Sequence, residues 1–423
     1  MSPLPVPTVN RPIHGTIRPP GSKSLTNRAL VCAALASGTS RLIRPLDSDD
    51  TRYMLQAVRQ LGVRTRGTLA DPLLEVDGCA GRWPATQADL YVGNSGTCMR
   101  FLTAVCALGQ GRYRLDGNAR MRERPISDLL EAMRALGVEV HDELHTGAPP
   151  VVVRTAGLAG GRVSVRGDVS SQFLSGLLLA APYSRAPVVL DISGTLVSRP
   201  YVDMTLAVMA SFGVQARWQQ ASLHVPQGCY RGCDYQIEPD ASAASYFLAA
   251  AAITGGNVTI DGLGANSLQG DVAFAHVLQQ MGCRVQRLPD RLTLAGGSLK
   301  GVDVDMKHIS DTVPTLAVVA LFADGPTTIS GVEHVRHKET DRLHALATEL
   351  RKLGAIVEER PDGLRITPTA LHGAQIDTYD DHRMAMSLAL AGLRTPGVVI
   401  SHPECTAKTY PGFFDDLFRL AGA

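Results

Sequence analysis

The sequence lacks an excess of charge of either sign. Its 41 Lys and Arg residues are balanced by 40 Asp and Glu residues, which leaves a formal net charge of +1 over 423 residues. Such a balance argues against a surface built mainly for nucleic acid or for an anionic membrane. Any site for an anionic ligand must therefore be local, formed by a few cations that the fold gathers in one place.

Long apolar runs are missing as well. The longest ones, such as residues 246–253, fall well short of the ~18–20 residues that span a bilayer. Residues 1–7 contain no basic segment that leads into an apolar run, so no signal or transit peptide is apparent. We therefore expect a cytoplasmic protein.

Cysteines are few and scattered. Several of the eight lie in apolar helical patterns, which indicates reduced, small core residues. Only Cys229 and Cys233 lie close together, and no second Cys or His pair stands at zinc spacing. We expect no metal site.

Length and composition favour a folded protein of two domains. Hydrophobic residues make up 45% and charged residues 19% of the chain, as in ordinary globular proteins. Single hydrophobic cores stop growing near roughly 250–300 residues, which 423 residues exceed.

A repeat is the strongest organising feature that is present. A helical pattern that ends in an apolar residue, then Gly, then a return to a strand, recurs with the glycines 75, 76, 69 and 72 residues apart. Glycine just past a helix is the usual C-terminal cap, because it enters the left-handed region without strain. The five markers are Leu61-Gly62-Val63, Leu136-Gly137-Val138, Phe212-Gly213-Val214, Met281-Gly282-Cys283 and Leu353-Gly354-Ala355.

Another helix, rich in small residues, precedes each marker and begins at a short polar cluster. With a sixth copy near the C-terminus, the repeated unit reads helix, strand, loop, helix, strand, strand, which predicts an α/β fold. The six starts are Ser22-Lys23-Ser24, Asn94-Ser95-Gly96, Ser170-Ser171-Gln172, Asp240-Ala241-Ser242, Ser310-Asp311-Thr312 and Asp380-Asp381-His382-Arg383.

The repeat is cut at both ends of the chain. The last copy stops without its closing strands, while the strand-like residues 15–18 precede the first helix start. We expect residues 1–20 to complete the C-terminal domain, so that one domain spans 21–236 and the other spans 1–20 plus 237–423. Pro- and Gly-rich segments near residues 19–21 and 238–240 suit the two crossings between them.

Cations gather near these helix starts and on the repeat loops. Helix N-termini bind anions, since they carry unsatisfied N–H groups and a partial positive charge. A lone Arg beside a helix is more often a solvated or ion-paired group, but recurrence at equivalent places favours a site for a ligand with several negative charges. The cations are Lys23, Arg28, Arg100, Arg120, Arg122, Arg124, Arg199, Arg336, Lys338, Arg342, Arg383 and Lys408.

Polar residues at the starts also have an ordinary explanation as N-caps. Capping is the favoured interpretation for Asp240 and Ser242. Residues 170–172 place three polar side chains at one start, more than capping needs. The segment 20–24 is not a P-loop, because Ser22 and Arg18 stand where that motif requires glycine.

These segments closely resemble the 5-enolpyruvylshikimate-3-phosphate synthase family, over nearly the whole chain and in order. The resemblance rests on Pro20-Gly21-Ser22-Lys23-Ser24 with Asn27-Arg28, Gly93-Asn94-Ser95-Gly96-Thr97 with Arg100, Arg122-Glu123-Arg124-Pro125-Ile126, Ser170-Ser171-Gln172-Phe173, Lys338-Glu339-Thr340-Asp341-Arg342, Asp381-His382-Arg383-Met384-Ala385-Met386 and Cys405-Thr406-Ala407-Lys408-Thr409.

The resemblance implies a fold and an activity. The fold is α/β, with two domains that each contain three βαβαββ-type units in an inside-out barrel and that close over an interdomain cleft. The activity is transfer of the enolpyruvyl group of phosphoenolpyruvate to the 5-hydroxyl of shikimate 3-phosphate, with release of phosphate, in aromatic amino acid biosynthesis. We expect no cofactor, no partner beyond the two small substrates, and a monomer.

The resemblance also implies site residues. Shikimate 3-phosphate would be bound by Lys23, Ser24, Arg28, Ser170, Ser171, Gln172, Ser198, Tyr201, Asp311 and Lys338. Phosphoenolpyruvate would be bound by Lys23, Asn94, Gly96, Arg124, Gln172, Glu339, Arg342, Arg383 and Lys408.

Three residues would do the chemistry. Asp311 is expected to take the hydroxyl proton, and Glu339 and Lys23 to exchange protons with the phosphoenolpyruvate carbon and the leaving phosphate. The alternative for each carboxylate is an ion-pair partner without a catalytic role.

Two positions depart from the family pattern. Many members carry Asn where His334 stands and Pro where Phe101 stands. We therefore do not count His334 among the expected ligands, and we infer nothing about the response to the inhibitor glyphosate.

Three other functions compete with this one. The sister transferase that uses UDP-N-acetylglucosamine generally has a reactive Cys before its Arg-Pro, and residues 117–125 contain none. A repeat array can also be a non-catalytic scaffold, although a scaffold does not need cations gathered at helix starts. A dinucleotide-dependent dehydrogenase lacks support, because no Gly-x-Gly-x-x-Gly follows a strand with an acid about twenty residues on.

Overall fold

Contacts divide the chain into two compact units, in a computed structural model that describes residues 2–422. The central unit is Gly21–Ile237, and the terminal unit combines Met1–Pro20 with Glu238–Ala423.

The central unit has six α-helices and three four-stranded sheets. Its helices are α1 (Lys23–Leu35), α2 (Asp49–Gln60), α3 (Gly96–Cys106), α4 (Ser127–Ala135), α5 (Ser171–Ala180) and α6 (Arg199–Ser211), with 3₁₀ turns η1 (Met121–Glu123) and η2 (Ala181–Tyr183). Its strands are β3 (Thr39–Ile43), β4 (Arg64–Arg66), β5 (Leu73–Asp77), β6 (Gln87–Tyr91), β7 (Gly111–Asp116), β8 (Glu139–Asp142), β9 (Val151–Thr155), β10 (Gly161–Arg166), β11 (Val188–Ser193), β12 (Arg217–Gln219), β13 (Ser222–Val225) and β14 (Asp234–Gln236). The sheets run β14-β3-β5-β4, β6-β7-β9-β8 and β10-β11-β13-β12.

The terminal unit repeats this plan. Its helices are α7 (Ala241–Thr254), α8 (Phe274–Gln280), α9 (Val313–Val319), α10 (Arg342–Lys352), α11 (His382–Gly392) and α12 (Phe413–Ala421), with 3₁₀ turns η3 (Gly270–Ala273), η4 (Ser310–Thr312), η5 (Ala320–Phe322), η6 (Glu333–His337) and η7 (Pro403–Lys408). Its strands are β1 (Leu4–Pro5), β2 (His14–Ile17), β15 (Asn257–Asp261), β16 (Arg284–Arg287), β17 (Arg291–Ala295), β18 (Asp303–Asp305), β19 (Thr327–Ser330), β20 (Ile356–Arg360), β21 (Gly363–Thr367), β22 (Gln375–Ile376) and β23 (Val399–Ile400). The sheets run β16-β17-β15-β2, β18-β19-β21-β20 and β1-β23-β22.

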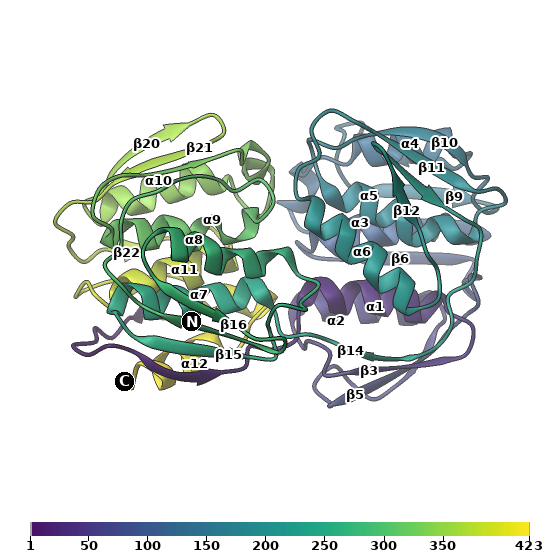
Figure 1. The fold of residues 1–423 in the computed structure, drawn as a ribbon. Coiled ribbons are helices and arrows are strands. Elements are labelled where there is room, and N and C mark those ends of the chain that lie inside the picture. Colours follow the sequence, from purple (N-terminus) through teal and green to yellow (C-terminus); the bar gives the residue numbers. More distant parts are fainter. Residues whose placement is uncertain (1, 423) are drawn as a thin grey trace. The chain divides into compact units, whose positions relative to one another are not determined.

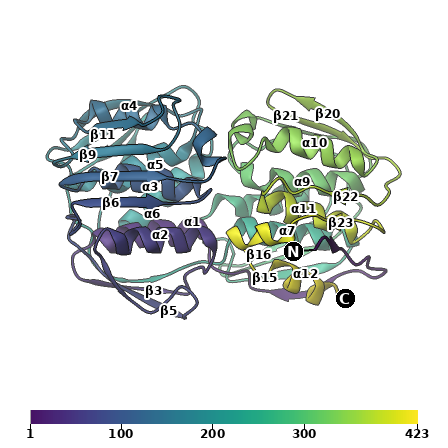
Figure 2. The ribbon, with the colours of Figure 1, turned by 180° about the vertical axis from the view of Figure 1, so that it is seen from behind.

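Helices form the interior of each unit, and the small sheets lie outside them. In the central unit α1, α3 and α5 contact one another, with β3 and β5 on one side and β9 and β11 on another (Figure 1). In the terminal unit α7, α9 and α11 take the same place (Figure 2). Every residue of α7 is buried, which suits its nearly uncharged, alanine-rich sequence.

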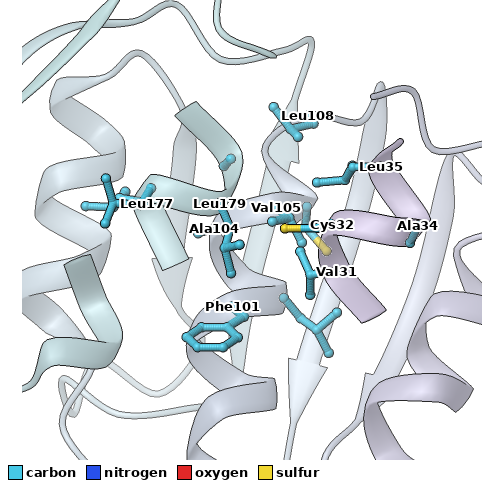
Figure 3. Packing of buried hydrophobic residues seen from close by; sticks show 14 of the residues in the cluster. Val31, Cys32, Ala34, Leu35, Phe101, Ala104, Val105, Leu108, Leu177 and Leu179 are labelled. Carbon is cyan, nitrogen blue, oxygen red and sulfur yellow. The ribbon is translucent and has the colours of Figure 1, made fainter. Parts of the chain in front are cut away.

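Small residues allow the inner helices to pack closely. A Cβ atom on Gly176 of α5 would lie 2.8 Å from the carbonyl oxygen of Arg100 on α3, so glycine is required there. Around this contact, Cys32 of α1, Phe101 of α3 and Leu177 of α5 belong to one buried cluster (Figure 3). The inner helices are thereby held in a fixed relation, which fixes where each of them begins.

The glycine markers are confirmed. Gly62, Gly137, Gly213, Gly282 and Gly354 have φ angles of 94°, 84°, 91°, 113° and 98°. Each lies two positions past the last residue of α2, α4, α6, α8 or α10 and has the left-handed backbone of a helix C-terminal cap.

Two strands pair with sheets that are distant from them in the sequence. Strand β2, which precedes α1, pairs in parallel with β15, and β14, which precedes α7, pairs in parallel with β3. Strand β1 pairs with β23 of the last repeat, and within residues 2–422 their sheet is β1-β23-β22. The N-terminal residues therefore complete two sheets of the terminal unit.

Candidate active site

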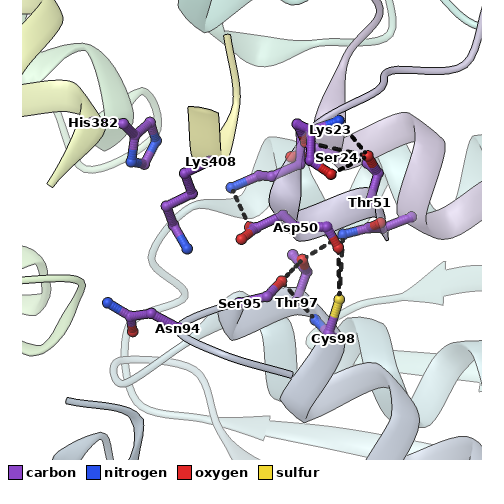
Figure 4. Close-up of polar contacts among 12 residues, drawn as sticks. Lys23, Ser24, Asp50, Thr51, Asn94, Ser95, Thr97, Cys98, His382 and Lys408 are labelled. Atoms are coloured by element: carbon purple, nitrogen blue, oxygen red, sulfur yellow. Dashed lines mark hydrogen bonds and ion pairs between the residues drawn. The ribbon is translucent and has the colours of Figure 1, made fainter. Parts of the chain in front are cut away.

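The starts of α1, α2 and α3 are tied together in the central unit. Asn27 Nδ2 donates to Thr97 Oγ1 at 2.8 Å, which joins α1 to the first turn of α3. Lys23 Nζ lies 3.4 Å from Asp50 Oδ2 of α2, and both side chains are nearly covered (Figure 4). Lys23 is thus a buried cation that stands at a helix N-terminus and is held by one carboxylate.

Arg28 connects three helices from a buried position. Its guanidinium donates to Thr205 Oγ1 at 2.7 Å, to Ser175 Oγ at 3.3 Å and to the carbonyl oxygens of Ser24 and Tyr201 at 2.9 and 3.0 Å. Burial lowers the pKa of Arg28 to about 10, so the side chain stays charged at neutral pH. Four of its five N–H groups are used within the protein, which leaves one for a ligand.

Phe101 packs against this guanidinium. The Arg28 Cζ atom lies 5.1 Å from the centroid of the Phe101 ring, a cation–π distance. Phe101, one of the two departures from the family pattern, therefore packs against Arg28, a predicted ligand of shikimate 3-phosphate.

A second cation stands at the start of α3. Arg124 Nη1 donates to both the carbonyl and the side-chain oxygen of Asn94, each at 3.1 Å. A Cβ atom on Gly96 would lie 2.5 Å from Arg124 Nη2 and 3.0 Å from Gln172 Oε1. The structure thus brings together four predicted phosphoenolpyruvate ligands: Asn94, Gly96, Arg124 and Gln172.

The polar starts of α5 and α6 complete the central cluster. Ser170 caps α5 by accepting from the N–H of Gln172 at 3.2 Å, so part of this polar group is explained by capping after all. Ser198 precedes α6 with a left-handed φ of 53°, and its carbonyl oxygen accepts from the N–H of Tyr201. Left-handed backbone in a non-glycine residue costs ~1–3 kcal/mol and is typical of functional sites.

Asp311 is the centre of the cluster in the terminal unit. Its Oδ1 accepts from Lys338 Nζ at 2.6 Å and from Arg342 Nη1 at 3.3 Å, and its Oδ2 accepts from Arg383 Nη2 at 2.7 Å. The side chain is 15% exposed, so it is not fully covered. A carboxylate, three cations and the start of the helical segment η4–α9 meet at one point.

Arg342 is the most buried of the three cations that bind Asp311. It donates to both oxygens of Asp381 at 2.8 and 3.2 Å and to Glu339 Oε2 at 2.8 Å, and its side chain is 1% exposed. Although burial opposes the charged form, the carboxylates of Asp381, Glu339 and Asp311 raise the pKa of Arg342 above its ordinary value. Arg342 therefore stays cationic.

Glu339 extends the cluster to the last predicted cation. Its Oε1 lies 4.0 Å from Lys408 Nζ, and both side chains are mostly covered. Arg383 also donates to the hydroxyl of Tyr246 at 3.4 Å. Burial raises the pKa of Tyr246 to about 12, so its hydroxyl stays protonated.

Burial also lowers the pKa values of Lys338 and His334. Burial, together with the neighbouring Arg342, lowers the pKa of Lys338, although Asp311 opposes the shift. Burial and the adjacent Lys338 lower the pKa of His334 to about 3, and its exposed fraction is 9%. His334 is therefore a neutral imidazole at the edge of this cluster.

A pH dependence of stability follows from His334. Because its folded-state pKa lies below the ordinary value of 6.5, its contribution is complete above pH 6.5 and is lost as the pH falls towards 3. We expect the free energy of unfolding to fall by about 2 kcal/mol between pH 7 and pH 5 through this group. Urea unfolding of the protein and of His334→Asn at both pH values measures this effect as the difference between the two curves.

The matched control is His14→Asn on β2, since His14 is exposed. Its curve should run parallel to that of the unchanged protein. Parallel curves for the unchanged protein and His334→Asn would show that the buried imidazole contributes nothing to the pH dependence.

Four predicted cations have partners outside the two clusters among the described residues. Arg122 binds Asp116 at 2.7 Å, Arg120 binds Glu123 at 2.8 Å, and Arg336 binds Asp341 and Glu359 at 2.9 and 2.8 Å. Arg199 lies over the ring of Trp218 at 4.7 Å and 3.5 Å from Asp203. For these residues the ion-paired alternative holds. Arg100 has a further structural role, since it donates to the carbonyl oxygen of Pro125 at 2.8 Å and holds the segment that carries Arg124.

The acids that bind two of the predicted cations were not among the predicted site residues. Asp50 holds Lys23, and Asp381 holds Arg342 while it also caps α11 by accepting from the N–H of Arg383 at 2.9 Å. Asp381 was identified only as part of a helix start. No local pattern links either acid to its cation, because 27 and 39 residues separate them in the sequence.

All eight cysteines are free thiols. Within the described part of the chain, no group of three or more His, Cys, Asp and Glu could hold a metal ion. Among residues 2–422, no helix is long and apolar enough to cross a membrane.

Repeated helix–strand units, with clusters of cations and carboxylates at the starts of their inner helices, define a class: α/β enzymes that bind small ligands carrying several negative charges. Comparison with known proteins specifies the family. The chain belongs to the family described as EPSP synthase (3-phosphoshikimate 1-carboxyvinyltransferase), whose sequence model matches residues 7–417.

Individual relatives agree. A 3-phosphoshikimate 1-carboxyvinyltransferase of Shewanella pealeana is 49% identical over 414 residues, 97% of each chain. One from Trichormus variabilis is 46% identical over 425 residues and covers 100% of both chains. A solved EPSP synthase of Acinetobacter baumannii matches the structure with a TM-score of 0.83 at 27% identity, over 100% of this chain and 98% of that one.

The expected fold class and activity are therefore confirmed. The chain is an enolpyruvyl transferase of the shikimate pathway, and it acts on phosphoenolpyruvate and shikimate 3-phosphate.

Proposed function

We propose that the two clusters supply the substrate contacts and the proton transfers of this reaction. The observation that carries the proposal is the convergence of Lys338, Arg342 and Arg383 on the Asp311 carboxylate. Three cations can hold the phosphate and carboxylate of two anionic substrates, and the carboxylate among them can take a proton.

Most of the residues proposed for shikimate 3-phosphate belong to the cluster of the central unit. Arg28 has one N–H left for the ligand, and the adjacent serines offer hydroxyl groups for its phosphate and ring hydroxyls. The proposed set is Lys23, Ser24, Arg28, Ser170, Ser171, Gln172, Ser198, Tyr201, Asp311 and Lys338.

Phosphoenolpyruvate binds mainly to arginine residues in this proposal, because their guanidinium groups are planar. Arg124 and Arg383 can bind a carboxylate or a phosphate through two parallel N–H groups, which Lys cannot do. The proposed set is Lys23, Asn94, Gly96, Arg124, Gln172, Glu339, Arg342, Arg383 and Lys408.

The chemistry takes two steps in this proposal. The 5-hydroxyl oxygen bonds to C2 of phosphoenolpyruvate while its proton passes to Asp311, and C3 takes up a proton from Glu339 or Lys23, which gives a tetrahedral ketal. The ketal then loses phosphate as C3 gives back a proton, and the enolpyruvyl double bond is restored. The fixed cations stabilise the negative charge of the departing phosphate.

Gly96→Ala tests the phosphoenolpyruvate site. The added Cβ would lie 2.5 Å from Arg124 Nη2, so the guanidinium must shift. We expect KM for phosphoenolpyruvate to rise by about tenfold, while kcat and KM for shikimate 3-phosphate change much less. Steady-state kinetics with each substrate varied in turn measure this effect.

Gly412→Ala is the control, since a Cβ there would meet no atom within 4 Å. It should keep both KM values. An unchanged KM for phosphoenolpyruvate in Gly96→Ala would remove Arg124 from its site.

Phosphate release tests the acceptor. The protein should release phosphate from phosphoenolpyruvate with shikimate 3-phosphate and should be inactive with UDP-N-acetylglucosamine, since residues 117–125 contain no cysteine. Activity only with the glucosamine acceptor would assign the chain to the sister reaction. We also propose that the protein is cytoplasmic and that it is a monomer. Sedimentation with and without both substrates would test the monomer.

A further inference from the structure

The segment before α11 has an unusual backbone. Tyr379 and Asp380 are consecutive non-glycine residues with left-handed φ angles of 54° and 53°. Such a conformation costs ~1–3 kcal/mol for each residue and persists only where the surroundings hold it. The next residue is Asp381, which caps α11 and binds Arg342 through both carboxylate oxygens. The turn at residues 377–381 therefore determines where Asp381 and Arg383 lie.

A buried carboxylate outside the cluster holds this turn. Glu349 of α10 is 0% exposed. Its Oε1 accepts from the hydroxyl of Tyr379 at 2.7 Å, and its Oε2 accepts from the N–H of Asp377 at 3.1 Å and from Lys352 Nζ at 2.9 Å. Lys352 in turn binds Asp377 Oδ2 at 2.8 Å. The proposed reaction uses neither Glu349 nor Tyr379.

Helix α10 thus binds both ends of the turn at residues 377–381. Arg342 and Glu349 are seven residues apart, close to two helical turns, so they lie on one face of α10. Arg342 binds Asp381 at the end of the turn, while Glu349 binds Asp377 and Tyr379 at its beginning. The first contact belongs to the active-site cluster, and the second contact fixes the backbone on which that cluster is built.

We propose that Glu349 and Tyr379 are positioning residues for phosphoenolpyruvate, because together they hold the strained turn that aims Arg383 at its ligand. This inference rests on the proposed function, which makes Arg383 a phosphoenolpyruvate ligand. Without the Tyr379 hydroxyl, one of the three donors to Glu349 is lost and the left-handed turn is free to relax. Asp381 and Arg383 then shift together, since one helix start carries both.

Tyr379→Phe is the sharpest test. Tyr379 is 39% exposed as a residue, so phenylalanine should fit without a change in packing. A ~1 Å misplacement of a binding group can cost ~10²-fold, and the loss of one bond of three should cost less, so we expect KM for phosphoenolpyruvate to rise by about tenfold. KM for shikimate 3-phosphate should stay within about twofold. Glu349→Gln should produce a larger rise of the same kind, since an amide nitrogen cannot accept from Asp377 or Lys352.

A matched control separates positioning from stability. Tyr113 in the central unit donates its hydroxyl to the carbonyl oxygen of Ala85, also at 2.7 Å. Tyr113→Phe removes a bond of the same length without touching either cluster, and both of its KM values should stay unchanged. All assays run well below the unfolding temperature of each variant, so that loss of folded protein does not enter KM.

The outcomes are distinct. If Tyr379→Phe behaves like Tyr113→Phe, or if it raises both KM values equally, the positioning role is overturned. Arg383→Lys tests the proposed function separately. If it keeps the original KM for phosphoenolpyruvate, Arg383 is not a ligand of this substrate, and the proposed function fails whatever Tyr379→Phe shows. If Arg383→Lys raises that KM and Tyr379→Phe does not, only the positioning role fails.

Discussion

Replacing Asp311 by asparagine is expected to lower kcat by ~10²-fold or more, while the dissociation constant of shikimate 3-phosphate changes little. Asparagine keeps the shape of the side chain and one oxygen for Lys338 and Arg342, which bind Oδ1 at 2.6 and 3.3 Å. Its amide nitrogen replaces the oxygen that accepts from Arg383 at 2.7 Å, so this one bond is lost. It cannot take the hydroxyl proton from the substrate. Phosphate release in the steady state gives kcat, and isothermal titration with shikimate 3-phosphate gives the dissociation constant.

A second aspartate of the same unit provides the control. Asp261 binds Arg18 at 2.9 Å in an exposed ion pair, away from the cluster. Asp261→Asn removes one carboxylate charge, as Asp311→Asn does, and should keep the original kcat. If Asp311→Asn instead lost binding and kept its turnover, Asp311 would be an ion-pair partner of the cations, which is the alternative that the sequence left open.

In the proposed mechanism Asp311 pairs with three cations and also takes a proton from the substrate. The charges around it bear on both roles. Lys338, Arg342 and Arg383 oppose the loss of its negative charge, because a proton on Asp311 leaves them without that counter-charge. Anionic groups of the substrates compete for the same N–H donors. As they take over these cations, the opposition to protonation weakens. In the proposed mechanism, proton transfer to Asp311 would therefore be coupled to the presence of both substrates.

The sequence predicted the repeat, the helix starts and most members of both clusters, for one physical reason. Glycine at a helix end and polar residues at a helix start are local signals, and their regular spacing shows which starts are equivalent. Five glycines with left-handed φ and caps at Ser22, Ser95, Ser170, Asp240 and Asp381 follow that pattern. The cations next to these starts were predicted with them.

The partners of those cations could not be predicted in the same way. Asp50 and Asp381 reach Lys23 and Arg342 across 27 and 39 residues of sequence, so only the tertiary structure brings them to these cations. Glu349 likewise reaches Asp377 and Tyr379 from 28 and 30 residues away. Arg122 and Arg336 show the opposite error, because their acids Asp116 and Asp341 are close in sequence but were not weighed against a ligand. Counting cations at helix starts therefore overestimates the site unless nearby acids are counted too.

Lys23→Met is expected to impair binding and turnover together. Methionine keeps an unbranched side chain that is one atom shorter, but it removes a buried cation at the start of α1. A hydrogen bond to a charged group contributes ~1.5–3 kcal/mol, so KM for each substrate should rise about 10- to 100-fold, and kcat should fall as the leaving phosphate loses a counter-ion. Steady-state kinetics measure all three quantities, and Lys307→Met, which breaks only an exposed pair with Asp305, should leave them unchanged.

The same variant deprives buried Asp50 of a cation, so a loss of stability could imitate a loss of function. Breaking a buried ion pair on one side costs ~3–5 kcal/mol, which thermal unfolding would reveal. Asp50→Asn in the Lys23→Met background removes the carboxylate and should restore most of this stability. If Lys23 contacts the substrates, activity stays low in the double variant although the fold is repaired. Recovery of activity together with stability would mean that Lys23 serves the fold alone.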